Sequence, residues 1–105
     1  MLFRSGKVHR NLGELSQAKE FYDRALAILL KKLGPHHVDV AKACYQLGKM
    51  HFDLGELSRA KEFYDRALAI LLKKLGPDHV DVAKTYNNMG NVHLCLGELS
   101  KAKEF

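Results

Sequence analysis

The 105-residue chain has no tryptophan, two cysteines and two prolines. The low numbers of cysteines and of prolines each exclude a class of protein. Two cysteines do not make the framework of a small disulfide-rich protein, so we expect a reducing, cytoplasmic compartment. Few prolines, together with 47% hydrophobic and 28% charged residues, exclude a collagen-like or disordered chain. The composition is that of one ordinary globular domain.

Long apolar runs and an excess of one charge are also missing. No run approaches the roughly 18 apolar residues of a membrane-spanning helix, and no apolar secretion signal follows the first residues. The 17 lysines and arginines and 12 aspartates and glutamates give a net charge of +5, and most of them interleave. A nucleic-acid binder concentrates its basic residues in a patch, so neither nucleic acid nor a membrane is the expected partner.

The sequence carries no catalytic motif. It contains no glycine-rich phosphate loop and no nucleophile elbow, so we expect no enzyme activity and no cofactor. His9, His51 and His93 recur at equal intervals along the chain. Successive helix pairs would place them roughly 10 Å apart, too far to share one metal ion, so we expect them to pack between helices and expect no metal site.

What the chain does contain is a long internal repeat. Residues 12–53 and 54–95 are identical at 31 of 42 positions, and residues 96–105 open a third copy. Nine of the eleven differences between the two copies fall within residues 43–53 and their equivalents. This distribution indicates a scaffold that is kept and one helix whose surface is free to vary.

The repeat has helical periodicity. Leu15, Ala18, Tyr22, Ala25 and Leu29 step by three and four residues, which is typical of an amphipathic helix. Glycines in the Leu-Gly-Glu-Leu and Leu-Gly-Pro segments predict helix ends, because glycine accepts the left-handed conformation and proline cannot continue a helix. The predicted helices span residues 2–12, 15–33, 37–54, 57–75, 79–96 and 99–105.

One helix start has a candidate cap. Asp78 is the expected N-cap of the helix that follows it, with Asp81 three residues later. His36 stands at the equivalent position of the earlier copy, so the cap there is expected to be weaker.

The spacing Cys44-x-x-Leu47-Gly48-x-x-His51, followed by Ala60-x-x-x-Tyr64, resembles the tetratricopeptide repeat (TPR) signature. The longer period and the Leu-Gly-Pro-Asp-His-Val-Asp-Val-Ala segment (75–83) resemble the 42-residue variant of kinesin light chains. The resemblance implies an all-α, right-handed solenoid of antiparallel helix pairs and a non-catalytic protein-binding role. We expect a single array over 1–105, with a partial repeat at 1–33, a full repeat at 37–75 and a partial repeat at 79–105.

In this family the first helix of each pair lines a concave groove that binds peptides. By helical spacing and the family pattern, the groove would be lined here by basic, amide and aromatic side chains, which suit an extended peptide. The predicted groove residues are Lys7, Lys42, Tyr45, Gln46, Lys49, Phe52, Lys84, Asn87, Asn88 and Asn91.

The two cysteines and the two ends of the chain lie outside the predicted groove. Cys44 stands where the signature has a core residue and is expected to be buried, whereas Cys95 lies at a predicted helix end. The chain begins inside one predicted helix and stops at Phe105 without the polar caps of complete arrays. We therefore hold two functions open: a scaffold that binds peptide segments, and a self-association module whose uncapped terminal repeats pair with another copy.

Overall fold

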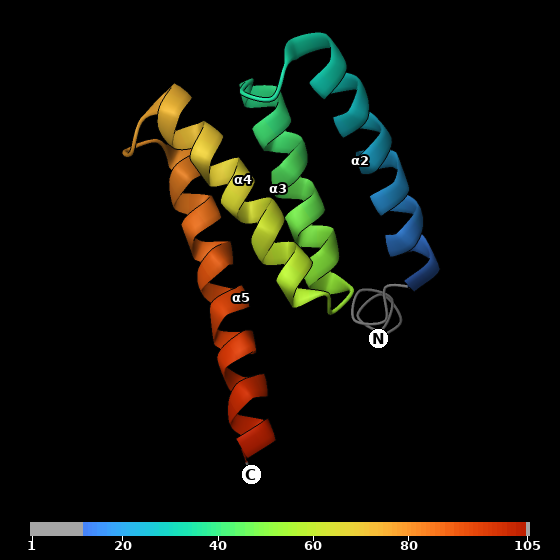
Figure 1. The fold of residues 1–105 in the computed structure, drawn as a ribbon, viewed down its shortest axis with the longest axis vertical. Helices are drawn as coiled ribbons and strands as arrows, with labels where there is room; N and C mark the ends of the chain where they lie inside the picture. Colours follow the sequence, from blue (N-terminus) through green and yellow to red (C-terminus); the bar gives the residue numbers. More distant parts are fainter. Residues whose placement is uncertain (1–11, 105) are drawn as a thin grey trace, which may run out of the picture.

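In a computed structural model, the backbone is described for residues 12–104 and the side chains for residues 13–97. This part of the chain forms four helices and no strand, namely α2 (Leu12–Leu33), α3 (Val38–Asp53), α4 (Leu57–Leu75) and α5 (Val80–Glu104). Successive helices run antiparallel, and each packs on the next (Figure 1). The predicted all-α repeat fold is confirmed here, and the helix expected at 2–12 lies outside the described residues.

Glycines in the left-handed conformation end the second, third and fourth of the predicted helices. Gly34, Gly55 and Gly76 have φ values of 89°, 83° and 91°. The N–H groups of Gly34 and Gly76 donate to the carbonyls of Leu30 and Leu72 at 3.1 and 3.2 Å, which closes the last turn of α2 and α4. These three predicted helix ends are confirmed.

The predicted helix end at Gly97 is wrong, because α5 continues through it to Glu104 instead of giving a separate helix at 99–105. At the equivalent Gly55 the chain turns back, and α4 packs along α3. The residues described after Gly97 amount to about two helical turns, which offer little packing in return for the helical hydrogen bonds that a turn would break. The start of α2 also differs from the prediction, since Gly13 lies within the helix.

The N-caps are histidines, which corrects the expectation for Asp78 and His36. His37 lies just before α3 in extended conformation, and its Nδ1 accepts the Asp39 N–H at 3.0 Å. His79 Nδ1 accepts the Asp81 N–H at the same distance. Asp78 is in the turn, one residue too early to cap the helix. The two caps are therefore equivalent, and the first is not the weaker one.

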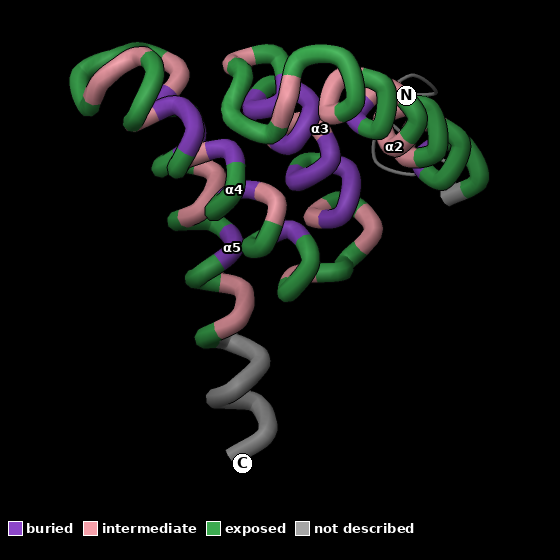
Figure 2. The backbone as a smooth tube through the Cα atoms, turned by 45° about the horizontal axis from the view of Figure 1, so that its top comes forward, coloured by how far each residue is buried: buried purple, intermediate pink, exposed green. Residues whose placement is uncertain are grey.

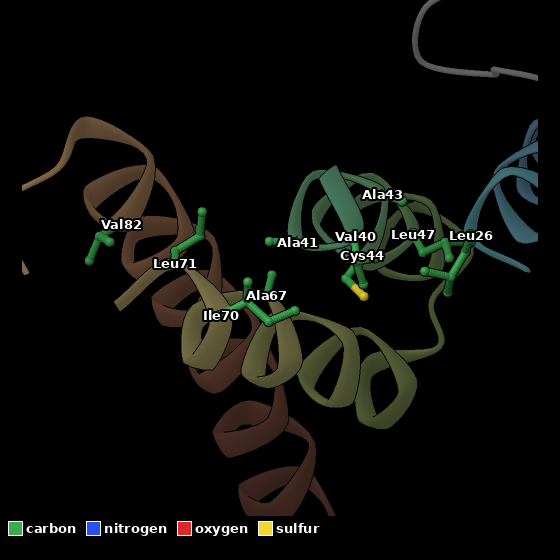
Figure 3. Close-up of a cluster of buried hydrophobic side chains, with 10 residues drawn as sticks. All are labelled: Leu26, Val40, Ala41, Ala43, Cys44, Leu47, Ala67, Ile70, Leu71 and Val82. Atoms are coloured by element: carbon green, nitrogen blue, oxygen red, sulfur yellow. The ribbon is translucent and has the colours of Figure 1, made fainter. Parts of the chain in front are cut away.

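The core lies between α3 and α4, and both neighbouring helices contribute one residue to it (Figure 3). Cys44 is fully buried there, as predicted, and burial raises the pKa of its thiol while Arg66 opposes the shift. Buried residues concentrate on α3, whereas α2 and the described part of α5 are largely exposed (Figure 2). The core cluster comprises Leu26, Val40, Ala41, Ala43, Cys44, Leu47, Ala67, Ile70, Leu71 and Val82.

Within the described part of the chain, none of the helices combines the length and the apolar character needed to cross a membrane.

Candidate functional site: a groove between α3 and α5

The first helices of the two repeats, α3 and α5, touch each other, and α4 packs on both. Side chains from the three helices line two pockets. The Lys42 pocket has a volume of about 220 Å³ and is lined by Ala41, Lys42, Tyr45, Gln46, Leu71, Asp81, Lys84 and Thr85. The Lys49 pocket has a volume of about 190 Å³ and is lined by Lys49, Phe52, Asp53, Tyr64, Asn88 and Asn91. We call the two pockets together the α3–α5 groove.

A hydrogen bond between the first helices joins the two pockets. Asn88 Nδ2 in α5 donates to the Tyr45 hydroxyl in α3 at 2.8 Å. Tyr45 lines one pocket and Asn88 the other, so this bond lies where the pockets adjoin. The Tyr45 ring also meets the Tyr64 ring edge to face, with centroids 5.8 Å apart. Two helices of successive repeats and the helix between them are thereby held in one arrangement.

Tyr64 forms part of the groove floor and keeps its proton. Its side chain is 2% exposed, and burial raises the pKa of its phenol far above the ordinary value of 10. The nearby Tyr45 and Asp53 raise this pKa further, while Asn88 opposes the shift. A neutral phenol can donate as well as accept a hydrogen bond, so the floor of the Lys49 pocket is polar without being charged.

Three lysine side chains surround the groove above the uncharged Tyr64. Lys42 and Lys84 line one pocket and Lys49 the other, and all three are exposed. Asp81 and Asp53 line the same two pockets. The arrangement offers ammonium groups to acidic side chains of a bound chain, and amide side chains that can bond to its backbone.

Eight of the ten predicted groove residues line the two pockets. Asn87 does not; it lines a neighbouring hollow with Tyr86 and Gly90, which shares only Asn91 with the groove. Lys7 lies outside the described residues. The eight are Lys42, Tyr45, Gln46, Lys49, Phe52, Lys84, Asn88 and Asn91.

The list of predicted groove residues lacks four polar residues that line the two pockets, namely Asp53, Tyr64, Asp81 and Thr85. Tyr64 is the repeat equivalent of Tyr22, whose helical spacing is typical of the apolar face of a helix, and it is buried; it also lines the Lys49 pocket. Asp81 was read only as part of a helix cap. Its position three residues before Lys84 on the same helix was a signal that it shares the groove face.

Comparison with protein families agrees with the helical repeat fold. The sequence matches the tetratricopeptide repeat family over residues 1–73 and again over residues 43–105. The chain belongs to the tetratricopeptide repeat family. TPR repeats are non-catalytic and generally mediate protein–protein interactions. A search of curated proteins finds no match to this chain.

In the TPR arrangement, the histidine of the signature has a structural role in the complete repeat. His51 is 1% exposed, its Nδ1 lies 2.6 Å from Glu56 Oε1, and its ring stacks on Phe63 with centroids 5.2 Å apart. His93, at the same repeat position in α5, is exposed. The predicted packing between helices is therefore confirmed for His51 and wrong for His93, and His9 lies outside the described residues.

Proposed function

We propose that this TPR chain is a non-catalytic interaction scaffold of the 42-residue, kinesin-light-chain-like type, which binds an extended peptide segment in the α3–α5 groove. The peptide carries acidic side chains, because the three lysines of the groove outnumber its two aspartates, Asp53 and Asp81. The proposal includes a single array over 1–105, with partial repeats at 1–33 and 79–105 and a full repeat at 37–75. It also includes a reducing, cytoplasmic compartment, which suits two free cysteines.

The observation that carries the proposal is the clustering of cationic and amide side chains from two different repeats around adjoining pockets. Lys42 and Gln46 come from α3, and Lys84, the repeat equivalent of Lys42, comes from α5. The hydrogen bond between Tyr45 and Asn88 holds the two helices at this spacing. A preformed site binds with less loss of conformational freedom than one that must be assembled on binding.

The sequence differences between the two copies of the repeat support the same groove as the binding surface. Residues 57–75 form a helix that matches residues 15–33 at every position except Arg59, which replaces Gln17. The differences concentrate in α3 and α5, at groove positions such as Gln46 and Lys49, which become Asn88 and Asn91. A repeat with a kept scaffold and varied first helices presents a different side-chain set to each segment of a bound peptide.

A phage-displayed library of random 12-residue peptides tests the proposal. The chain should enrich peptides with two or more acidic residues, and a synthetic peptide from the enriched set should bind in a fluorescence-polarisation assay. Lys42→Glu combined with Lys84→Glu should weaken its binding by at least about tenfold, since two favourable contacts of exposed charges, each worth about 0.5–1 kcal/mol, become repulsive.

The matched control is Arg24→Glu combined with Arg59→Glu, which changes the charge equally at exposed positions on α2 and α4 that line neither pocket. This control should bind the peptide like the unaltered chain. Equal losses in the two double variants would mean that net charge alone drives binding. Failure to enrich any acidic peptide would remove the proposal.

The second candidate, self-association, is favoured by a different observation, namely the uncovered face of α5.

A further inference from the structure

One face of α5 lies open although three of the four equivalent positions in α3, namely Cys44, Gly48 and His51, are buried. Tyr86 is 52% and Leu94 68% exposed, and Gly90 and His93 are exposed beside them. These residues line a hollow with a volume of about 680 Å³, which extends to Lys61 of α4. The hollow shares only Asn91 with the α3–α5 groove, so what covers the hollow is largely a separate question from the proposed peptide site.

The same face of α3 shows what fits there, because α4 covers it. Gly48 lies so close to Tyr64 that a Cβ atom on it would be 2.7, 2.8 and 2.9 Å from three carbons of the ring. His51 stacks on Phe63, and Ile70 of α4 is 8% exposed in the same interface. The glycine is thus a notch that receives a tyrosine ring from the second helix of the repeat.

The notch in α5 is empty of such a ring. Gly90 is the repeat equivalent of Gly48, and a Cβ atom on it would meet nothing within 4 Å apart from its chain neighbours and the backbone of its own helix. His93 and Tyr86 occupy the repeat positions of His51 and Cys44. The α5 face therefore carries the glycine and histidine that α3 uses against α4, without a helix packed over them.

A helix with the required sequence exists in every copy of this chain. Residues 15–33 in α2 differ from residues 57–75 in α4 at a single position. Phe21 is 67% and Ile28 61% exposed in α2, whereas Ile70, the equivalent of Ile28, is buried against α3. The helix that fits the α5 face thus presents Phe21 and Ile28 to solvent, while its Tyr22 is half-buried against the core cluster.

We propose that α2 of a second copy docks on the α5 face, with the partner's Tyr22 over Gly90 and the partner's Phe21 against His93. The interface repeats the α3–α4 packing within the chain, so its side-chain complementarity is already built into the sequence. Burying the exposed apolar groups of both faces removes them from water and drives the association. The inference does not rest on the peptide-binding proposal.

The two docking faces differ, so the contact is heterologous. A copy that offers its α5 face to one neighbour still offers its α2 face to another, and the assembly grows head to tail instead of closing as a symmetric dimer. Each added copy continues the stacking order of the helices. Apart from Asn91, the residues that line the α3–α5 groove are not among those of the hollow, so we expect the assembly to leave most of the groove accessible.

Light scattering behind a sizing column, over a wide range of dilution in reducing buffer, tests the proposal on the whole chain. The mass should be near 11.9 kDa at high dilution and should rise past twice that value as concentration increases. Gly90→Leu should lower the association constant at least about tenfold, because the added side chain fills the notch. Open space around Gly90 means that this change leaves the fold intact. Ile28→Lys should block the other face in the same way.

Two controls match these variants at exposed positions that face solvent. Ala69→Leu adds the same apolar side chain on α4, and Ala27→Lys introduces the same charge on α2. Both should associate like the unaltered chain. Circular dichroism should show equal helix content in all four variants.

Mixing decides between the proposed contact and its alternatives. Gly90→Leu still has a working α2 face, and Ile28→Lys still has a working α5 face, so the two variants should be monomeric alone and form a 1:1 heterodimer together. A symmetric contact between two α5 faces would leave Ile28→Lys dimeric and overturn the proposal. A chain that stays monomeric at all concentrations would overturn it too, as it would if residues 98–105 folded back over the α5 face or if residues 2–12 of the same chain, which carry the equivalent Gly6 and His9, covered the α2 face. Peptide binding is measured separately, so failure of one proposal leaves the other standing.

Discussion

Replacing Gly48 by alanine places a methyl group against the ring of Tyr64, whereas the same replacement of Gly90 places it in open space. A Cβ on Gly48 would be 2.7 Å from the nearest ring carbon, a separation that the ring must relieve by moving. Tyr64 is 2% exposed and held edge to face by Tyr45, so it has little room to move. The two glycines occupy the same repeat position in two helices, and they differ in what packs on them.

The magnitudes follow from two opposing effects. Alanine in place of a helical glycine stabilises a helix by about 1 kcal/mol. Overpacking of a buried site costs about 1–3 kcal/mol, and the rigid surroundings of Tyr64 put Gly48 at the upper end. Gly48→Ala should therefore lower the free energy of unfolding by about 2 kcal/mol, and Gly90→Ala should raise it by about 1 kcal/mol.

Urea denaturation followed by circular dichroism, at a concentration where the chain is monomeric, measures both changes. Tyr64→Leu provides a further check, because it removes the ring from the notch. In the Tyr64→Leu background, Gly48→Ala should be far less destabilising, which a double-mutant cycle reports as a coupling free energy. If Gly48→Ala is as stable as Gly90→Ala, the notch does not hold the ring and the reasoning fails, including its use at the α5 face.

Three further predictions test the packing and the caps. His51→Ala should lower the free energy of unfolding by about 3 kcal/mol, because it removes a buried hydrogen-bonded ring, while the exposed His93→Ala should change it by less than about 0.5 kcal/mol; thermal denaturation compares them. His79→Ala should destabilise by about 1 kcal/mol through loss of an N-cap, and Asp78→Ala should be nearly neutral in the same assay. In iodoacetamide labelling at pH 8, Cys44 should react at least about tenfold more slowly than the second cysteine of the chain, because burial raises the pKa of its thiol and the thiolate is the reactive form.

Each of these predictions has a contrary outcome and, for the thiol, a pH dependence. Equal effects of the two histidine-to-alanine changes would mean that the stacked ring contributes nothing to the fold. If Asp78→Ala lowered the free energy of unfolding more than His79→Ala, Asp78 and not His79 would be the N-cap. The folded state binds the proton of Cys44 more tightly than the unfolded state, so the free energy of unfolding should fall as the pH rises past the ordinary thiol value of 9.0. Rapid labelling of Cys44 in the folded chain would contradict its burial.

The helices and three of their ends were predictable because each depends on a local signal. Gly34 and Gly76 are followed by proline, so no continuation of the helix competes with the turn. Gly97 carries the same neighbours as Gly55 and still lies within a helix, because the packing of a returning helix decides the outcome. The N-cap prediction was wrong for a related reason. Whether Asp78 or His79 lies directly before the first helical turn depends on the shape of the preceding loop.

The groove was predictable where helical spacing places residues on one face. Lys42, Gln46 and Lys49 follow from that spacing, and the structure brings them to the groove. Asn87 shows the limit, because neighbouring positions on a helix point about 100° apart and a small error in the assumed orientation moves a residue to another face. The participation of Tyr64 depends on how α4 crosses under the two first helices, which no single-helix pattern contains.

The uninterrupted α5 bears on how such a chain is made. The segment Leu-Gly-Glu-Leu-Ser forms a turn and a helix start at 54–58 and continuous helix at 96–100. The free-energy difference between these two conformations is therefore small enough for the packing of a following helix to reverse it. A ribosome delivers the first helix of each repeat before the second. In a growing chain, the newest repeat would accordingly form one uninterrupted helix. This helix would break at its glycine only when enough of the following helix had been synthesised to pack against the first. Synthesis would then proceed as a series of such folding steps, one for each repeat added.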